Sequence, residues 1–362
     1  MKPSRLVVPL VSALVIAATS LVPDRREREE ARFVPLVAVD EAGLVVRPDG
    51  TKSQLTALSL VDARHGELLF ARVRGRWRCV TYFMAPADAG RITQLVNAIV
   101  DEKALDATPA RDVEAWIAQF GLDDASAEHV VLRGPDALKP EANGDVLAEV
   151  VIGSGGTVRR ATGAGDARRV EDEVLRSSAR LERFFEPPVT VDPNTLPPLV
   201  SARVVPEDWV GFQSGLEHVF VDRADGTGFE LQRVVDPATP TGLTAWDLRE
   251  SADEPWRRAH PVLSTGYTLF LGRTPVVRAL DPRTVPRSVT DTPAARITLV
   301  SAAKDVVELL VGEVDAFGVR LVVNLDTQAA YELAPEPSRL VLPSVAMLEK
   351  PGAEIPWDPY LH

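Results

Sequence analysis

Alternating apolar and polar residues predict β-hairpins along most of the chain. Residues 67–83 (ELLFARVRGRWRCVTYF) hold two β-prone segments on either side of Arg74-Gly75, a dipeptide that suits a tight turn. Similar segments surround Asp49-Gly50 and Asp225-Gly226. The chain also has 29 prolines against 23 glycines, a balance that favours short strands and stiff connectors over long helices.

A glycine-rich stretch, Gly153-Ser154-Gly155-Gly156, separates two further apolar segments. A phosphate-binding loop would need a following lysine and a helix whose amino end faces the anion. The lysine is missing here, and the next residues, Thr157-Val158-Arg159-Arg160, suit a strand. Residues 306–323 repeat the pattern of 146–160 without the glycine run. We therefore interpret the stretch as the turn of a hairpin.

Helical spacing of apolar residues is confined to a few segments. Residues 87–105 place apolar side chains on one face, and Asp88 suits the N-cap. Residues 108–121 predict a second, shorter helix that ends at a glycine. Both segments carry the apolar stripe of a helix that covers one face of a sheet.

Two more segments have weaker helical character. Residues 171–185 begin with Glu171-Asp172-Glu173, which suits the acidic first turn of a helix. Residues 269–280 occupy the place that the helix at 87–105 has in the first half, although Pro275 argues against a continuous helix there. We therefore expect a helix from Glu171 to Phe185 and only a weak one at 269–280.

The organisation of the chain suggests two modules. A length of 362 residues exceeds what one hydrophobic core usually supports, and the proline-dense segment EPPVTVDPNTLPP suits a semi-rigid connector. We predict an α+β fold with two tandem modules of antiparallel β-hairpins and a few packed helices, after an N-terminal transmembrane helix. The expected bounds are 1–32 for a membrane anchor and charged spacer, 33–185 for the first module, 186–198 for the linker, 199–345 for a second, degenerate module and 346–362 for an extended tail.

The apolar run Leu6–Val22 carries no charge and lies near the lower length limit for a membrane-spanning helix, which is about 17 residues. We expect it to anchor the protein in a membrane. A cleaved signal peptide, with Ala18-Thr19-Ser20 as the cleavage site, and a buried helix are the alternatives. Arginines after the run outnumber the basic residues before it, so charge alone leaves the orientation open, and we expect the large domain to be exported.

Composition restricts the possible partners and cofactors. A formal net charge of -12 argues against a nucleic-acid surface, because phosphate contacts require clustered lysine and arginine. Cys79 is the sole cysteine, which excludes an intrachain disulfide and a cysteine-based zinc or iron–sulfur site. It shares one strand face with Trp77, so we expect a core position rather than a nucleophile. We predict no bound cofactor.

Candidate catalytic or metal-binding residues do not converge in the sequence. The five histidines are widely separated and form no metal-binding motif. The stretch 211–215 (GFQSG) has the wrong spacing for a nucleophile elbow, and Asp222 to Gly226 suits a turn better than a calcium loop. A hydrolase would require His218 or His260 beside a carboxylate and a serine. We therefore expect no catalytic or metal site.

The sequence offers two candidate binding surfaces. One is a basic patch on an otherwise acidic protein, which suits an acidic partner or lipid headgroups. The other is a concave aromatic pocket for an extracytoplasmic ligand such as glycan or peptide. The residues of the basic patch are Arg159, Arg160, Arg168 and Arg169, and those of the aromatic pocket are Trp209, Trp246, Trp256 and Tyr267.

The order of these motifs resembles the bacterial domain-of-unknown-function 4340 family. The resemblance covers mainly residues 60–175: a strand pair ending in GRWRCV, then Pro86-Ala87-Asp88 opening a helix, then Phe120-Gly121-Leu122-Asp123 and VVIG before a hairpin with an arginine pair. It implies an envelope protein, sometimes encoded beside subunits of ABC-type transport systems linked to gliding motility, with no established catalytic residues. We expect a single-pass protein of the bacterial inner membrane with the bulk of the chain in the periplasm.

We therefore expect a non-enzymatic, membrane-anchored envelope protein that serves as an accessory or scaffold subunit of a membrane complex. Its partners would be the membrane, through Leu6–Val22, and subunits of an ABC-type transporter. The alternative is an extracytoplasmic binding module for glycan or peptide. An exposed apolar or basic patch would favour the first hypothesis, and a concave aromatic pocket the second.

Overall fold

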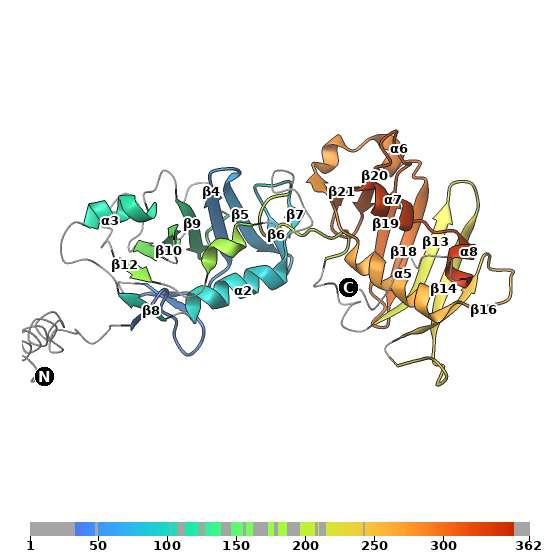
Figure 1. Ribbon diagram of the computed structural model, residues 1–362, viewed down its shortest axis with the longest axis horizontal. Helices are drawn as coiled ribbons and strands as arrows, with labels where there is room; N and C mark the ends of the chain where they lie inside the picture. The colour runs from blue at the N-terminus through green and yellow to red at the C-terminus, as the bar shows by residue number, and fades with distance from the viewer. Residues whose placement is uncertain are drawn as a thin grey trace, which may run out of the picture.

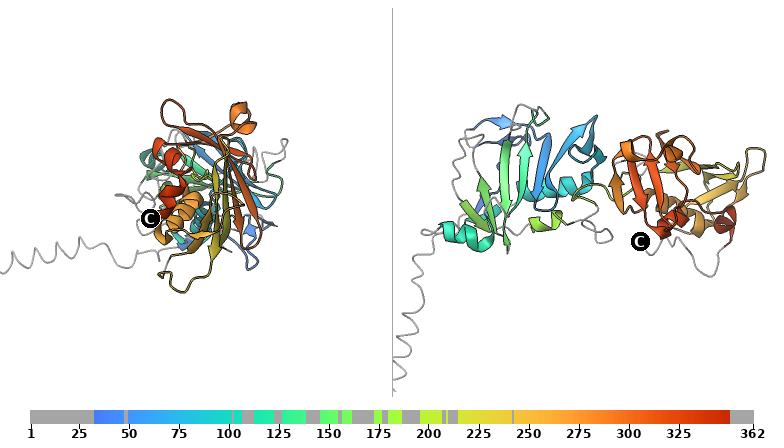
Figure 2. Two further views of the ribbon diagram at one scale, coloured as in Figure 1. Left: turned by 90° about the vertical axis from the view of Figure 1, so that its right-hand side faces the viewer. Right: turned by 90° about the horizontal axis from the view of Figure 1, so that it is seen from above.

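The computed structural model describes residues 33–350 except 48–49, 102, 107–112, 123–126, 139–145, 155–156, 162–172, 177–179, 187–195, 207–208, 210–214 and 242. The described residues form two large antiparallel sheets with a few helices, an α+β fold. The two sheets lie one after the other along the long axis of the molecule (Figure 1, Figure 2). None of the described helices has the length and apolarity needed to cross a membrane, and Leu6–Val22 lies outside the described residues.

Ten described strands form the first sheet, in the order β1-β8-β12-β11-β10-β9-β4-β5-β6-β7. A small hairpin of β2 and β3 stands beside it. The strands are β1 (Phe33–Pro35), β2 (Val45–Val46), β3 (Lys52–Ser53), β4 (Ala57–Asp62), β5 (Gly66–Val73), β6 (Arg76–Cys79), β7 (Ala85–Pro86), β8 (Lys103–Asp106), β9 (Glu128–Arg133), β10 (Val146–Ile152), β11 (Thr157–Ala161) and β12 (Glu173–Arg176). The helices are α2 (Ala89–Val100), α3 (Val113–Phe120) and the short 3-10 helix η4 (Leu181–Phe184).

Nine described strands form the second sheet, in the order β16-β15-β14-β13-β18-β19-β20-β21-β17. These strands are β13 (Leu216–Arg223), β14 (Gly228–Val234), β15 (Ala245–Arg249), β16 (Arg257–Arg258), β17 (Arg278–Leu280), β18 (Ala295–Ser301), β19 (Val306–Val311), β20 (Arg320–Asn324) and β21 (Ala329–Leu333). The helices are α5 (Pro261–Arg273), the 3-10 helix η5 (Pro282–Thr284), α6 (Arg287–Thr290), α7 (Pro335–Leu340) and α8 (Val345–Glu349).

The two sheets share one topology. In each, a four-stranded meander leads into a long helix, then a strand on the far side of the sheet, a short helix and a second four-stranded meander. In the first sheet, β1 pairs with the outer side of this strand. The order β7-β6-β5-β4-β9-β10-β11-β12-β8 thus corresponds strand for strand to β16-β15-β14-β13-β18-β19-β20-β21-β17. The hairpins at 146–160 and 306–323, predicted from their similar sequences, occupy equivalent places as β10–β11 and β19–β20. Trp77 of β6 and Trp246 of β15 are likewise equivalent, and both are buried.

Helix α2 forms as predicted. Asp88 is its N-cap, and its carboxylate accepts a 2.8 Å hydrogen bond from the Arg91 amide, which satisfies one of the free donors of the first turn. Ile92, Leu95 and Ile99 are fully buried against one face of the first sheet, the spacing of a single helical stripe. Figure 1 shows α2 running along this face, and α5 along the equivalent face of the second sheet.

Short helices cover part of the opposite faces. Adjacent residues of a strand point to opposite sides of a sheet, so Val150 joins the large core, whereas Val151 packs with Leu122 after α3. Gly153 begins the glycine-rich turn at this place, where a Cβ would lie only 2.5 Å from the carbonyl oxygen of Phe120. The hairpin turn predicted for this stretch is confirmed, and at Gly153 the close approach of α3 explains the glycine.

The chain between the sheets hydrogen-bonds to both modules. The Ser201 amide donates to the Pro86 carbonyl, and the Asp88 amide donates to the Leu199 carbonyl, both at 2.8 Å. On the other side, the Val276 amide donates to the Ala202 carbonyl at 3.1 Å. Residues 196–200 are also buried, although 187–195 lie outside the described residues. The segment 199–204, called the junction strand below, therefore connects the β7 edge with the chain leading into β17.

Two predicted elements are wrong. Residues 173–176 form strand β12 instead of the start of a helix, because β11 and β8 offer backbone partners on both sides. Among the described residues of the helix expected up to Phe185, the 3-10 helix η4 is the helical part. The tail expected to be extended from residue 346 begins within helix α8, and residues 351–362 lie outside the described residues.

Candidate binding cleft at the junction of the two sheets

A cleft of about 780 Å³ opens where the two sheets meet. The first module contributes the β5–β6 turn, strand β6 and the β6–β7 turn. The second module contributes η5 and the β20–β21 turn. The residues lining the cleft are Val73, Arg74, Arg76, Arg78, Val80, Phe83, Met84, Asp281, Pro282, Arg283, Asp326, Thr327 and Gln328.

Polar contacts connect the two modules at the cleft. Arg76 of β6 forms an ion pair with Asp326 of the β20–β21 turn. Arg78, two residues along the same strand, donates from Nη1 to the Thr327 carbonyl at 2.9 Å. The Tyr82 hydroxyl donates to the Ala279 carbonyl at 3.2 Å. Because arginines two apart on a strand point to the same side, β6 presents both guanidinium groups to the second module.

The cleft is electropositive on an acidic protein. Four arginines and two aspartates line it, so its formal charge is 4 − 2 = +2, against -12 for the whole chain. Asp281 is neutralised locally, because the Arg283 guanidinium donates to both carboxylate oxygens. These hydrogen bonds hold the pKa of Asp281 below its ordinary value and raise the pKa of Arg283. The remaining arginines, Arg74, Arg76 and Arg78, all belong to the β5–β6 hairpin.

Arg74 differs from its neighbours. It lies at the exposed tip of the β5–β6 turn, and among the described residues no hydrogen bond or ion pair involves its side chain. Its backbone is left-handed, with φ of 52°, and is followed by Gly75 at 81°. Two successive positive φ values are the geometry of a tight hairpin turn, which projects the side chain at its tip.

Backbone strain is concentrated around this cleft. Seven described residues other than glycine have positive φ, and four of them line the cleft: Arg74, Phe83, Met84 and Gln328, with φ between 52° and 58°. Each such residue costs free energy that the surrounding structure must offset, and strained residues gather at functional sites. Phe83 and Met84 are also each 42 % exposed, which places two large apolar side chains at the mouth of an arginine-rich cleft.

The aromatic residues predicted to form a ligand pocket do not line this cleft. Trp209, Trp246 and Tyr267 are 2 % exposed or less and belong to the large hydrophobic core. Trp256 is half-buried and stacks under the guanidinium group of Arg249, 4.4 Å from its ring centroid. The structure corrects the hypothesis of a concave pocket built from these four residues, because burial of three of them removes their rings from any ligand.

The predicted basic patch is only partly described. The backbone of Arg159 and Arg160 lies in β11, paired with Val151 and Val150 of β10. Arg168 and Arg169 lie outside the described residues. The cleft arginines Arg74, Arg76 and Arg78 were not singled out from the sequence, although the RVRGRWR spacing placed two of them on one strand face.

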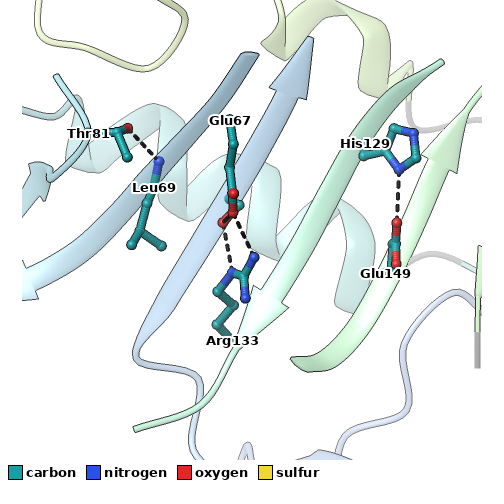
Figure 3. A network of polar contacts seen from close by, with 7 residues as sticks. Glu67, Leu69, Thr81, His129, Arg133 and Glu149 are labelled. Atoms are coloured by element: carbon teal, nitrogen blue, oxygen red, sulfur yellow. Dashed lines mark hydrogen bonds and ion pairs between the residues drawn. The ribbon is translucent and has the colours of Figure 1, made fainter. Parts of the chain in front are cut away.

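A second polar cluster lies on the face of the first sheet opposite α2 (Figure 3). His129 of β9 and Glu149 of β10 form a buried pair, 2.9 Å between Nδ1 and Oε1. On the same face the Ser59 hydroxyl donates to Glu67 at 2.7 Å and accepts from the Arg133 Nε at 2.8 Å. The hydroxyl is held by Glu67 and Arg133, and the imidazole is held by Glu149. The described contacts therefore do not join the Ser59 hydroxyl to the His129 imidazole, as a nucleophile would be joined to its base.

Other candidate chemistry has a structural explanation. Cys79 is fully buried, which confirms the predicted core position, and burial raises the pKa of its thiol to about 11. Asp225 accepts from the amide and hydroxyl of Thr227, the turn chemistry expected for this stretch. Among the described residues no three His, Cys, Asp or Glu side chains converge on a metal position. Ser214 lies outside the described residues.

Comparison of the chain with family models, curated proteins and solved structures finds no match. The resemblance to the domain-of-unknown-function 4340 family therefore stays a prediction from the order of the sequence motifs.

Proposed function

We propose that the protein is a non-enzymatic, membrane-anchored envelope protein that serves as an accessory or scaffold subunit of a membrane complex. The observation that carries this proposal is the junction of the two sheets. Backbone hydrogen bonds of the junction strand and side-chain contacts from β6 hold the modules together around an open cleft. Two sheets joined in this way suit a binding surface, because loops positioned by a scaffold often carry binding residues.

The proposed organisation is a tandem repeat behind a membrane anchor. The shared strand order supports two copies of one ancestral module, because matching nine strands and two helix positions by convergence is improbable. The apolar run Leu6–Val22 would hold these modules at the bacterial inner membrane, with the bulk of the chain in the periplasm. Subunits of an ABC-type transporter are the partners that the family resemblance suggests.

Co-purification tests this proposal. The tagged full-length protein would be extracted from native membranes in mild detergent, beside a variant that lacks Leu6–Val22, and the recovered proteins identified by mass spectrometry. We expect transporter subunits with the full-length protein and their loss, together with membrane association, in the deletion. Recovery of the protein alone, or full-length protein in the soluble fraction, would overturn the proposal.

An extracytoplasmic binding module is the second candidate, and the cleft favours it. Its volume of about 780 Å³ falls within the range of about 300–1,000 Å³ that is usual for ligand pockets. The predicted aromatic residues no longer support this candidate, because three of them are core. A ligand would instead contact the arginines and the two exposed apolar side chains at the junction.

A further inference from the structure

We infer that the junction cleft binds an acidic peptide segment of a partner protein, with carboxylates on the β5–β6 arginines and an apolar side chain on Phe83 and Met84. The inference rests on the proposed function, since it names the chemistry through which an accessory subunit would hold its partner. It places the site at the boundary between the two sheets, away from the predicted basic patch at Arg159 and Arg160.

The charge of the cleft selects an anion. A guanidinium group presents a planar fork of donors that matches a carboxylate, so neighbouring arginines are suited to a segment rich in Asp and Glu. Arg76 and Arg78 are oriented by their contacts with Asp326 and Thr327, which reduces the entropy lost when they bind a ligand. On a chain with net charge -12 this local +2 also directs an acidic segment to the cleft rather than elsewhere.

Arg74 could bind a ligand without first losing another contact. Its side chain is exposed, and within the described part of the chain it has no partner to give up. The tight turn fixes its backbone above the cleft. A carboxylate at this place would form a charge-assisted hydrogen bond without breaking an existing ion pair.

The apolar residues distinguish a peptide from a free anion. Phe83 and Met84 hold left-handed backbone conformations that expose both side chains at the cleft. Val80 and Pro282 continue the apolar surface between the arginines. Phosphate or a small carboxylate would use the guanidinium groups alone and leave this surface in water. A segment with an aromatic or aliphatic residue between acidic ones would cover both kinds of surface.

Fluorescence anisotropy with the full-length protein in mild detergent tests the inference. The ligands are a labelled pentapeptide EDFED and its neutral counterpart QNFQN. We expect EDFED to bind and QNFQN not to bind, with Arg74→Gln weakening EDFED about tenfold, the loss expected for one charged contact. Phe83→Asn removes the ring and tolerates positive φ, and it should weaken binding to a similar extent.

Arg64→Gln is the matched control. Arg64 is an exposed arginine in the β4–β5 turn, at the opposite end of β5 from Arg74, and its loss changes the net charge by the same amount. We expect this variant to bind EDFED within about twofold of the native affinity, as for any distant surface charge. Equal weakening by Arg64→Gln and Arg74→Gln would overturn the site, because the effect would then be that of overall charge.

Two further outcomes separate the alternatives. Full displacement of EDFED by millimolar inorganic phosphate, with no effect of Phe83→Asn, would overturn the peptide and leave a simple anion site. Failure of EDFED to bind, combined with intact recovery of transporter subunits by the Arg74→Gln variant, would overturn this inference while the proposed function stands. Loss of the subunits from Arg74→Gln but not from Arg64→Gln would support both.

Discussion

Arg76 and Asp326 lie 250 residues apart in the sequence and form an ion pair across the junction of the two sheets. Both side chains are about one-third exposed, so the pair should stabilise the protein by only about 0.2–1 kcal/mol. We expect Arg76→Asp to open the junction to limited proteolysis without unfolding either sheet. The double variant Arg76→Asp with Asp326→Arg should restore protection, since it reverses the pair. Equal protease sensitivity of the single and double variants would contradict a role for the pair.

The junction strand can be tested by removing one backbone donor. Ser201 is 4 % exposed, and its amide donates to the Pro86 carbonyl at 2.8 Å. Ser201→Pro deletes this amide hydrogen and leaves a buried acceptor without its partner, so unfolding in urea should require about 1–3 kcal/mol less free energy. Ser201→Ala keeps the backbone donor and serves as the control. An unchanged urea midpoint for the proline variant would show that the junction strand does not hold the modules.

Glu128 predicts a pH dependence of stability. Burial, with repulsion from Asp62 as a smaller cause, raises the pKa of this carboxyl to about 7 in the folded protein. A raised folded pKa means that the folded state binds the proton more tightly than the unfolded state. This contribution to stability is fully present below the unfolded pKa of about 4.5 and is lost as the pH rises through about 7.

Glu128→Gln should therefore stabilise the protein under mildly alkaline conditions. The side chain is half exposed, and solvent screening reduces the gain to about 1 kcal/mol near pH 8. Near pH 4 the native protein and the variant should unfold at the same denaturant concentration, because the carboxyl is then protonated in the folded state. Denaturant titrations at both pH values measure this. A gain of equal size at the two values would contradict a titration of Glu128.

The buried aromatic residues of the second sheet predict unequal effects of truncation. Trp246 is 2 % exposed within the core, so Trp246→Ala should lower the free energy of unfolding by about 3–5 kcal/mol. Trp256 is half-buried, and its contact with Arg249 contributes about 0.5–1 kcal/mol, so Trp256→Ala should cost far less. Thermal unfolding followed by circular dichroism compares the two. Similar costs would mean that burial does not separate their roles.

Local sequence patterns predicted the hairpins and helix α2 because their causes are local. The turn dipeptide Arg74-Gly75 and the capping residue Asp88 act within a few residues of themselves. Strand β12 was missed because its acidic start favours a helix locally, whereas its place in the sheet depends on pairing with β11 and with β8, which lies far back in the sequence. The strand conformation there is a tertiary effect that overrides propensity.

The start of helix α5 was not predicted from the sequence for a different reason. Its start at Pro261 was missed, and the helix ends before Pro275. Its buried residues include Ser264, Thr265 and Gly266 as well as Tyr267, so the sequence has no polar face and no clear helical period. The cleft could not be predicted from the sequence for a further reason. Arg283 and Asp281 are two residues apart, but Arg76 meets Asp326 only when the two modules dock.

The junction strand also governs how the sheets can associate with other chains. Strands β7 and β17 are the edge strands of their sheets, and edge strands with free backbone groups are templates for pairing with other molecules. The Pro86 carbonyl accepts a hydrogen bond from the Ser201 amide. The Val276 amide, just before β17, donates to the Ala202 carbonyl. The linker therefore occupies backbone groups at the β7 edge and directly before β17, so these groups cannot pair with another chain, and recognition at the cleft falls to side chains.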